Sequence, residues 1–291
     1  MSHRISSLGI VGAGTMGAGI AQVAILSGLQ VLLYDAVGPA LTKGQSRIAQ
    51  SLSRAVGKGL IQADDAEVAL RRLSAVSQLA EVRDAPFIIE AAPEDLPLKQ
   101  RLFTELDGLV GSAAILATNT SSLSVTAIAG ATRRPGRVVG MHFFNPVPMM
   151  KLVEVVVSQR TDPAVVEETT ELARRLGKTP VRAKDTPGFI VNRIARHFSL
   201  EALRILGEGQ IAHDHIDRVM KRAGRFRMGP FELMDLIGID VNFAVSRSVF
   251  EAFFHDPRFR PDPIQQRMVE SGLLGRKTGR GFYEYPESQR V

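Results

Sequence analysis

The stretch Ile10-Val11-Gly12-Ala13-Gly14-Thr15-Met16-Gly17 decides the fold expected for the first part of the chain. It lies between an apolar run and a helix-forming segment, and a second apolar run follows and ends at Asp35. A Gly-x-Gly-x-x-Gly pattern in this strand–turn–helix setting, with an acid about twenty residues on, is typical of a dinucleotide-binding βαβ unit. The alternative, a glycine-rich surface turn with an ordinary acid at position 35, leaves this setting unexplained.

The three glycines have separate roles in such a unit. Gly12 allows a tight turn, Gly14 lets the backbone approach a pyrophosphate, and Gly17 lets helix and strand pack closely. The free N–H groups at the helix start, around Thr15 and Met16, then face the phosphates.

Asp35 indicates which dinucleotide binds. A carboxylate at this position accepts hydrogen bonds from a ribose 2′-hydroxyl and repels a 2′-phosphate. The next residues, Ala36-Val37-Gly38, offer no arginine to receive that phosphate. The sequence therefore favours NAD over NADP as cofactor.

The composition limits the remaining possibilities. The chain has 291 residues, 45% hydrophobic and 23% charged, as expected for a soluble protein of about two domains. It contains no cysteine, so disulfides and thiolate sites are excluded, and we predict no metal site. The net charge of +6 comes from scattered basic residues, so we expect no nucleic-acid partner. No apolar run is long enough to span a membrane and no targeting segment is evident, so we expect a cytoplasmic location.

Strands and helices are predicted to alternate in the first part of the chain. The apolar runs indicate strands over residues 5–11, 31–35, 87–90 and 114–118. Helical patterns cover residues 39–75, with a break at Gly57 and Gly59, and residues 96–109, and a short helix should begin near Ser121 or Ser122. This alternation predicts βαβ units and a mainly parallel sheet.

Two further strands are predicted over residues 138–144 and 152–157. The Pro-rich turn between them is too short for a crossover helix, so the two strands should be antiparallel neighbours or a sharply bent pair. Helical periodicity then covers residues 190–206, 213–223, 231–254 and 263–270. We therefore predict an NAD-binding Rossmann-like domain over residues 1–183, followed by an all-helical domain over residues 184–291 that contacts substrate and forms a dimer.

His142 and Glu154 are the polar residues that interrupt these two apolar strands. An unpaired carboxylate would be costly to bury there. If the strands fold back on each other, Glu154 can bind one ring nitrogen of His142 and leave the other as a general base. The alternative is a structural His–Glu pair. Of the other histidines, His213, His215 and His255 are predicted to be solvated, and His197 half-buried.

Six segments occur in a characteristic order. They are residues 12–17, Glu90-Ala91-Ala92-Pro93-Glu94, Asn119-Thr120-Ser121-Ser122, His142-Phe143-Phe144-Asn145-Pro146, Asp185-Thr186-Pro187-Gly188-Phe189-Ile190-Val191-Asn192-Arg193, and residues 277–283. Over essentially its whole length the chain thereby resembles the L-3-hydroxyacyl-CoA dehydrogenase family, and is closest to its short 3-hydroxybutyryl-CoA type.

The resemblance implies roles for individual residues. His142 would take the proton of the substrate C3 hydroxyl, with Glu154 orienting it, while Ser121 and Asn192 would bind the reacting oxygens. Beyond the glycine-rich turn, the residues that would contact NAD are Glu94, Lys99, Asn119, Ser121, Asn145 and Lys277. On local sequence alone, Ser121 would pass for a helix N-cap, Asn192 for a polar residue of a first helical turn, and Glu94 and Lys99 for ordinary charges.

Ser51 and Lys58 match the positions that touch coenzyme A in the resembled family. This helix departs from the family pattern, because it is poor in lysine and Gly57 and Gly59 flank Lys58. The expected function is oxidation of (S)-3-hydroxyacyl-CoA by NAD. The alternatives are a dehydrogenase of a free hydroxy or sugar acid, similar to gulonate dehydrogenase, and a non-enzymatic relative similar to a lens crystallin.

The apolar residues of the second domain exceed what one helical layer would bury. Exposed patches of that size mark interfaces, so we expect a two-fold homodimer through this domain. The residues concerned are Phe231, Leu233, Met234, Leu236, Ile237, Phe243, Val249, Phe250, Phe253 and Phe254.

Replacing Asp35 tests the cofactor preference. NAD should support turnover far better than NADP in the unmodified protein. The double variant Asp35→Ser/Ala36→Arg should narrow this gap, because it removes the repulsion of the 2′-phosphate and adds a partner for it. The measurement is kcat/KM with each cofactor, and equal use of both by the unmodified protein would contradict the assignment.

Overall fold

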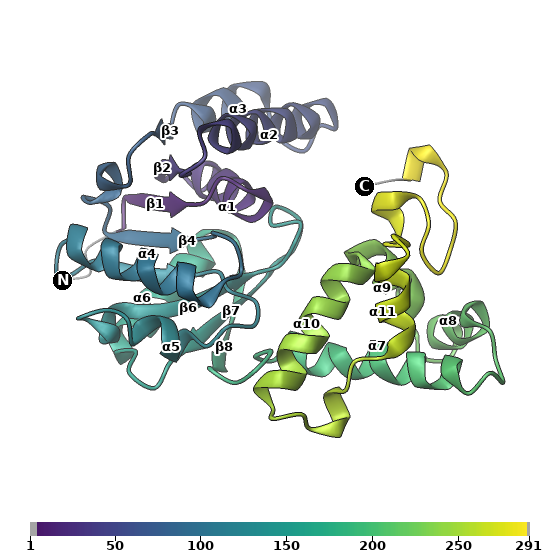
Figure 1. Cartoon of the computed structure of the whole chain (residues 1–291). Coiled ribbons are helices and arrows are strands. Elements are labelled where there is room, and N and C mark those ends of the chain that lie inside the picture. Colours follow the sequence, from purple (N-terminus) through teal and green to yellow (C-terminus); the bar gives the residue numbers. More distant parts are fainter. Residues whose placement is uncertain (1–4, 290–291) are drawn as a thin grey trace. The chain divides into compact units, whose positions relative to one another are not determined.

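The computed structural model describes residues 5–289, which form two compact units. The first unit ends at Thr186 and the second begins at Pro187 (Figure 1). The boundary predicted from sequence lies slightly earlier, after residue 183, and residues 1–4 and 290–291 of the predicted domains lie outside the described range. Within that range no helix is both long and apolar enough to cross a membrane.

The first unit is built on an eight-stranded sheet in the order β3-β2-β1-β4-β5-β6-β7-β8. Neighbouring strands are parallel except for β6 and β7, which are antiparallel as predicted. The strand order reverses between β1 and β4, the position at which sheets of this kind bind their ligands. The strands are β1 Ser7–Val11, β2 Gln30–Tyr34, β3 Leu73–Val76, β4 Phe87–Glu90, β5 Ile115–Thr118, β6 Val138–Phe143, β7 Leu152–Val157 and β8 Thr179–Lys184.

Helices cover both faces of this sheet (Figure 1). Side chains of α1 and α6 share one apolar core with Ile10, Ile89 and Met141 of the strands. A Cβ on Gly140 would lie 2.9 Å from Val125 of α5, so α5 packs on the opposite face, together with α4. The helices are α1 Thr15–Leu26, α2 Gly38–Gly57, α3 Ala63–Leu70, α4 Leu96–Leu109, α5 Val125–Ala129 and α6 Pro163–Arg175, with 3-10 turns at Leu79–Val82 and Pro135–Arg137.

Two local expectations for this unit are wrong, and the sequence analysis did not predict the last strand. The helical pattern over residues 39–75 ends at Leu70, and β3 follows as a short, mostly exposed edge strand without a continuous apolar run. Strand β8 is likewise polar and exposed, and it tolerates Pro180 because it lies at the other edge of the sheet. The short helix begins at Val125 rather than near Ser121, because Ser124 caps it and Asp185 binds two of its first N–H groups.

The second unit, described by itself, is helical. Its apolar core includes Leu200 and Leu203 of α7 and Phe231 and Met234 of α9. The predicted single helix over residues 231–254 is two helices, because Gly238 adopts φ +99°, a conformation that interrupts a helix. The helices are α7 Val191–Gly207, α8 His213–Arg222, α9 Pro230–Ile237, α10 Ile239–Ala252 and α11 Pro263–Glu270, with 3-10 turns at Pro257–Phe259, Arg276–Thr278 and Glu287–Gln289.

Helix α2 packs closely against the glycine-rich turn. Gly44 is buried, and a Cβ added there would lie 2.6 Å from the carbonyl oxygen of Ala13 and 2.9 Å from its Cβ. Gly57, in the last turn of the same helix, would place a Cβ in open space. Substitution of Gly57 therefore tests only the helix propensity of α2, whereas substitution of Gly44 also tests the contact between α2 and the glycine-rich turn.

Alanine at these two positions should have opposite effects. Gly44→Ala forces α2 away from the turn, so it should destabilise the protein by roughly 1–3 kcal/mol and weaken NADH binding. Gly57→Ala should leave NADH binding unchanged and stabilise the protein by up to about 1 kcal/mol. Urea unfolding and titration of NADH fluorescence measure both quantities, and similar results for the two variants would contradict the packing described.

Candidate active site

The glycine-rich turn between β1 and α1 has a shape that fits a bound pyrophosphate. A Cβ on Gly12 would lie 2.6 Å from the carbonyl oxygen of Ala91, and one on Gly17 would lie 1.7 Å from that of Gly12. A Cβ on Gly14 would meet nothing within 4 Å, so this glycine borders open space. No side chain caps the start of α1 at Thr15, which leaves the first N–H groups of the helix to a ligand.

Asp35 follows β2 at the same end of the sheet. Its Oδ2 accepts a hydrogen bond from the N–H of Ala13 at 2.7 Å, and its Oδ1 accepts one from the N–H of Val37 at 2.9 Å. These bonds fix the carboxylate beside the glycine-rich turn. A carboxylate held there fits the ribose of a dinucleotide whose pyrophosphate lies on that turn.

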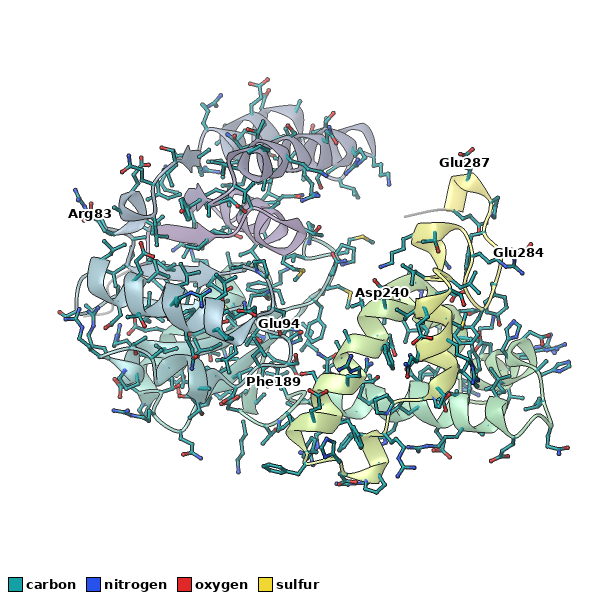
Figure 2. The ribbon with its side chains drawn as sticks, viewed as in Figure 1. Arg83, Glu94, Phe189, Asp240, Glu284 and Glu287 are labelled. Carbon is teal, nitrogen blue, oxygen red and sulfur yellow. The ribbon has the colours of Figure 1, made fainter. Side chains whose placement is uncertain are left out.

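Glu94 organises the loop that follows β5. Its Oε1 accepts hydrogen bonds from Thr120 Oγ1 at 2.7 Å, from Ser121 N at 2.7 Å and Oγ at 3.0 Å, and from Ser122 N at 3.0 Å. Burial by itself would raise the pKa of Glu94, but the Lys99 ammonium and these hydrogen bonds outweigh it and hold the pKa below its usual value. Glu94 therefore stays ionised and fixes the backbone and hydroxyl of Ser121. Figure 2 marks Glu94 in the first unit.

Lys99 forms a buried ion pair with Glu90, which the sequence analysis did not predict. Its Nζ donates to Glu90 Oε1 at 2.5 Å and to the carbonyl oxygen of Ala92 at 3.1 Å, and lies 3.6 Å from Glu94 Oε2. Glu90 also accepts a hydrogen bond from Thr118 Oγ1 at 2.6 Å. Glu90 directly follows three apolar strand residues, so the cost of burying a carboxylate, which singled out Glu154, could have identified it too.

His142 and Glu154 lie directly opposite each other on the antiparallel strands β6 and β7. His142 Nδ1 and Glu154 Oε2 are 2.7 Å apart, and both side chains are buried. The imidazole also packs on Phe144, with ring centroids 4.5 Å apart. The two strands therefore place a carboxylate on one imidazole nitrogen, which is the arrangement that the sequence analysis expects of these two residues.

Two more predicted cofactor residues border this pair. Asn119 Oδ1 accepts a hydrogen bond from the N–H of Phe143 at 2.9 Å, which links the loop after β5 to β6. Asn145 is exposed in the turn after β6, and its peptide bond to Pro146 is cis. The first unit thus brings the glycine-rich turn, Asp35, Glu94, Ser121 and the His–Glu pair to the carboxyl ends of its central strands or to the loops that follow.

Asn192 and Lys277 belong to the second unit. Asn192 lies in the first turn of α7. Lys277 Nζ is 2.6 Å from Oδ2 of Asp240, which Figure 2 marks. The segment that carries Lys277 is held by Asp235, whose carboxylate accepts hydrogen bonds from the N–H groups of Phe282 and Tyr283.

Ser51 is half-buried on α2, and Lys58 is the exposed C-cap residue that follows the helix. Residues seven apart on a helix share a face, so one elongated ligand could contact both. Two histidines differ from expectation. His213 packs on Tyr283, with ring centroids 4.8 Å apart, rather than being solvated, and His197 is exposed rather than half-buried.

Comparison with known proteins identifies the family of the chain. The model of the 3-hydroxyacyl-CoA dehydrogenase NAD-binding domain matches residues 7–186, and that of the C-terminal domain of the same family matches residues 188–285. A 3-hydroxyadipyl-CoA dehydrogenase of Escherichia coli K12 is 47% identical over 285 residues, which are 98% of this chain and 60% of that protein. The chain therefore spans only about three-fifths of the length of this relative.

Other relatives match along their whole length. A 3-hydroxybutyryl-CoA dehydrogenase of Mycobacterium tuberculosis is 40% identical over 287 residues, covering 98% of this chain and 100% of that protein. The crystal structure of an (S)-3-hydroxybutyryl-CoA dehydrogenase from Ralstonia eutropha is 41% identical, with a TM-score of 0.93, and covers 98% of this chain and 100% of that one. These matches confirm the predicted fold class, the dehydrogenase class and NAD as cofactor. The chain belongs to the 3-hydroxyacyl-CoA dehydrogenase family.

Proposed function

We propose that the protein oxidises short-chain (S)-3-hydroxyacyl-CoA, with 3-hydroxybutyryl-CoA as the reference substrate, to 3-oxoacyl-CoA. The observation that carries this proposal is the buried pair of His142 Nδ1 and Glu154 Oε2 at 2.7 Å, in a chain of this family. The printed names of the relatives support the substrate class, because all three are dehydrogenases of 3-hydroxyacyl-CoA thioesters. The expected cytoplasmic location stays a prediction.

The proposed reaction uses the two nitrogens of His142 for different tasks. Glu154 binds Nδ1, which fixes the tautomer and stabilises the imidazolium, and Nε2 takes the proton of the C3 hydroxyl. When bound, NAD supplies the acceptor for the hydride that leaves C3. Ser121, fixed by Glu94, and Asn192 hydrogen-bond the reacting oxygens in this proposal.

Coenzyme A is the part of the substrate that Ser51 and Lys58 would bind. The Lys58 ammonium lies on a flexible stem at the exposed end of α2 and can follow a mobile phosphate or pantetheine group. A dehydrogenase of a free hydroxy or sugar acid would share the His–Glu pair but would not need this contact. NADH formation from 3-hydroxybutyryl-CoA, from free 3-hydroxybutyrate and from gulonate therefore separates the two functions. Turnover confined to the thioester supports the proposal, and turnover confined to a free acid contradicts it.

The His–Glu pair gives a sharper test of the catalytic roles. His142→Gln should lower turnover by roughly 10²- to 10⁴-fold, the usual contribution of a general base, and leave NADH binding nearly unchanged. Glu154→Gln should also slow turnover, because it keeps the shape but loses the charge that stabilises the imidazolium. Since the two residues act as a unit, the double variant should be little worse than His142→Gln alone.

Steady-state rates and NADH titrations of the three variants measure these effects. His215→Gln is the matched control, because His215 is exposed on α8 and should tolerate the change without loss of rate. Independent losses that multiply in the double variant would contradict the proposed pair.

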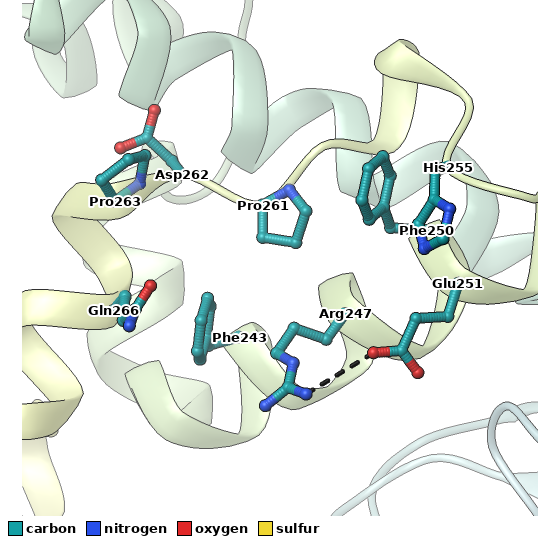
Figure 3. Close-up of a pocket in the computed structure, with 9 residues that line it drawn as sticks. All are labelled: Phe243, Arg247, Phe250, Glu251, His255, Pro261, Asp262, Pro263 and Gln266. Atoms are coloured by element: carbon teal, nitrogen blue, oxygen red, sulfur yellow. Dashed lines mark hydrogen bonds and ion pairs between the residues drawn. The ribbon is translucent and has the colours of Figure 1, made fainter.

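A homodimer through the second unit is the second part of this proposal. Of the ten apolar residues that suggested it, Phe231, Met234 and Val249 are buried in the unit's own core, so they are not available to a partner. Leu236, Ile237 and Phe254 are exposed, Phe254 by 93%. Phe243 and Phe250 line an open pocket of about 330 Å³, together with Arg247 and Glu251 (Figure 3). The exposed apolar residues at the two ends of α10 support an interface between two copies.

The mass in solution tests the dimer. Light scattering at micromolar concentration should give about twice the chain mass of 31.6 kDa. Phe254→Lys should shift the equilibrium towards the monomer, because it places a charge in the apolar interface. The matched control is Val37→Lys, an exposed apolar residue of the first unit. A monomer mass for the unmodified protein would count against this interface.

A further inference from the structure

Arg196 lies in the second turn of α7, and only 4% of its surface is exposed. No other arginine of residues 5–289 is buried. Arg196 Nε donates to the carbonyl oxygen of Asn192 at 3.3 Å. Its Nη1 donates to the carbonyl oxygen of Asn242 at 2.9 Å and to Ser246 Oγ at 3.2 Å. All three acceptors are neutral, and within residues 5–289 no carboxylate lies at ion-pair distance from this guanidinium.

The charge of this guanidinium is therefore not compensated by the protein. Burial lowers the pKa of Arg196 to about 10, so the side chain still carries its positive charge at neutral pH. A buried cation is costly unless an anion pairs with it. The neutral acceptors satisfy Nε and Nη1 but supply no negative charge, which leaves the guanidinium suited to bind a carboxylate.

The second terminal nitrogen gives a ligand a place to bind. Nη2 donates no hydrogen bond to any of the described residues. It is not fully buried either, so it keeps surface that a ligand can reach. The rest of the group is held firmly. Gln265 Nε2 donates to Asn242 Oδ1 at 2.7 Å, and Ser246 Oγ donates to the carbonyl oxygen of Asn242 at 2.9 Å. A guanidinium fixed in this way loses little freedom when it binds an anion.

Arg196 lies one helical turn after Asn192, on the same face of α7. Four residues advance a helix by about 6 Å. Beyond C3 of a six-carbon acyl chain, three carbon–carbon bonds of about 1.5 Å each span about 4 Å. A hydrogen bond of about 3 Å covers the remaining distance. A carboxylate at C6 can thus reach Arg196 while Asn192 binds an oxygen at the reacting end.

We propose that Arg196 is a specificity-determining residue that pairs with a carboxylate at the far end of the acyl chain. Among the 3-hydroxyacyl-CoA thioesters of the proposed function, those of six-carbon 3-hydroxy dicarboxylic acids are then better substrates than those whose chains end in a methyl group, 3-hydroxybutyryl-CoA included. This inference rests on the proposed function, because it requires Asn192 to bind the reacting part of a 3-hydroxyacyl chain.

Two thioesters of equal carbon number test this inference in the unmodified protein. With 3-hydroxyadipyl-CoA the chain ends in a carboxylate, and with 3-hydroxyhexanoyl-CoA it ends in a methyl group. We expect kcat/KM for the first to be about ten- to a hundredfold higher, the usual effect of hydrogen bonds to a charged group. Equal values for both substrates would overturn the role of Arg196 and leave the proposed function intact. Turnover of neither substrate would overturn both.

Variants then assign the preference to the side chain. Arg196→Gln should lower kcat/KM for 3-hydroxyadipyl-CoA to the level of 3-hydroxyhexanoyl-CoA, whose own value should change less than about threefold. Arg196→Lys keeps the charge and should retain part of the preference. The matched control is Arg204→Gln, on the same helix but paired with Glu201 at the surface, which should keep the full preference.

Equal losses for the two substrates in Arg196→Gln would mean that the arginine only clamps α7 to α10, and would overturn the proposal. If Arg196→Gln fails to fold, as judged by its Tm, the comparison of the two thioesters in the unmodified protein still decides the question.

Discussion

The carboxylate of Glu90 is completely buried at the end of β4, and donors from three elements meet it. Lys99 reaches it from α4, Thr118 from β5, and the N–H of Ala92 from the loop after β4. A buried carboxylate without such partners would cost several kcal/mol, and removal of one partner of a buried ion pair typically costs about 3–5 kcal/mol. This requirement fixes the loop that carries Glu94.

Glu94, which lies in the loop after β4, holds Ser121 in position. Glu94 gathers the backbone and hydroxyl groups of residues 120–122, so the segment after β5 is set by an acid that is itself set by Lys99 and Glu90. A continuous network of hydrogen bonds and ion pairs thus runs from the sheet core to a residue expected to bind substrate. Side chains held by supporting contacts of this kind keep the precise geometry that catalysis needs.

Glu154, three strands further along the sheet on β7, is under the same constraint as Glu90. The turn after β6 reverses the chain, so β7 returns antiparallel and places Glu154 directly opposite His142. A parallel strand would have required a long crossover and would not have produced this short-range pair. Arg196 in the second unit is also a buried charged group, but it is a cation, and its partners in the protein are all neutral.

The sequence by itself determined the features that depend on local pattern. The glycine-rich turn, the central strands, the reversal between β6 and β7 and the His142–Glu154 pair follow from apolar runs, glycine spacing and polar residues inside apolar strands. The edge strands β3 and β8 could not be read in this way, because they are mostly exposed and lack an apolar run. Only the tertiary structure decided the break at Gly238, the Glu90–Lys99 pair and the neutral surroundings of Arg196. These features depend on contacts between residues distant in sequence or on a backbone conformation that packing selects, and no local pattern specifies either.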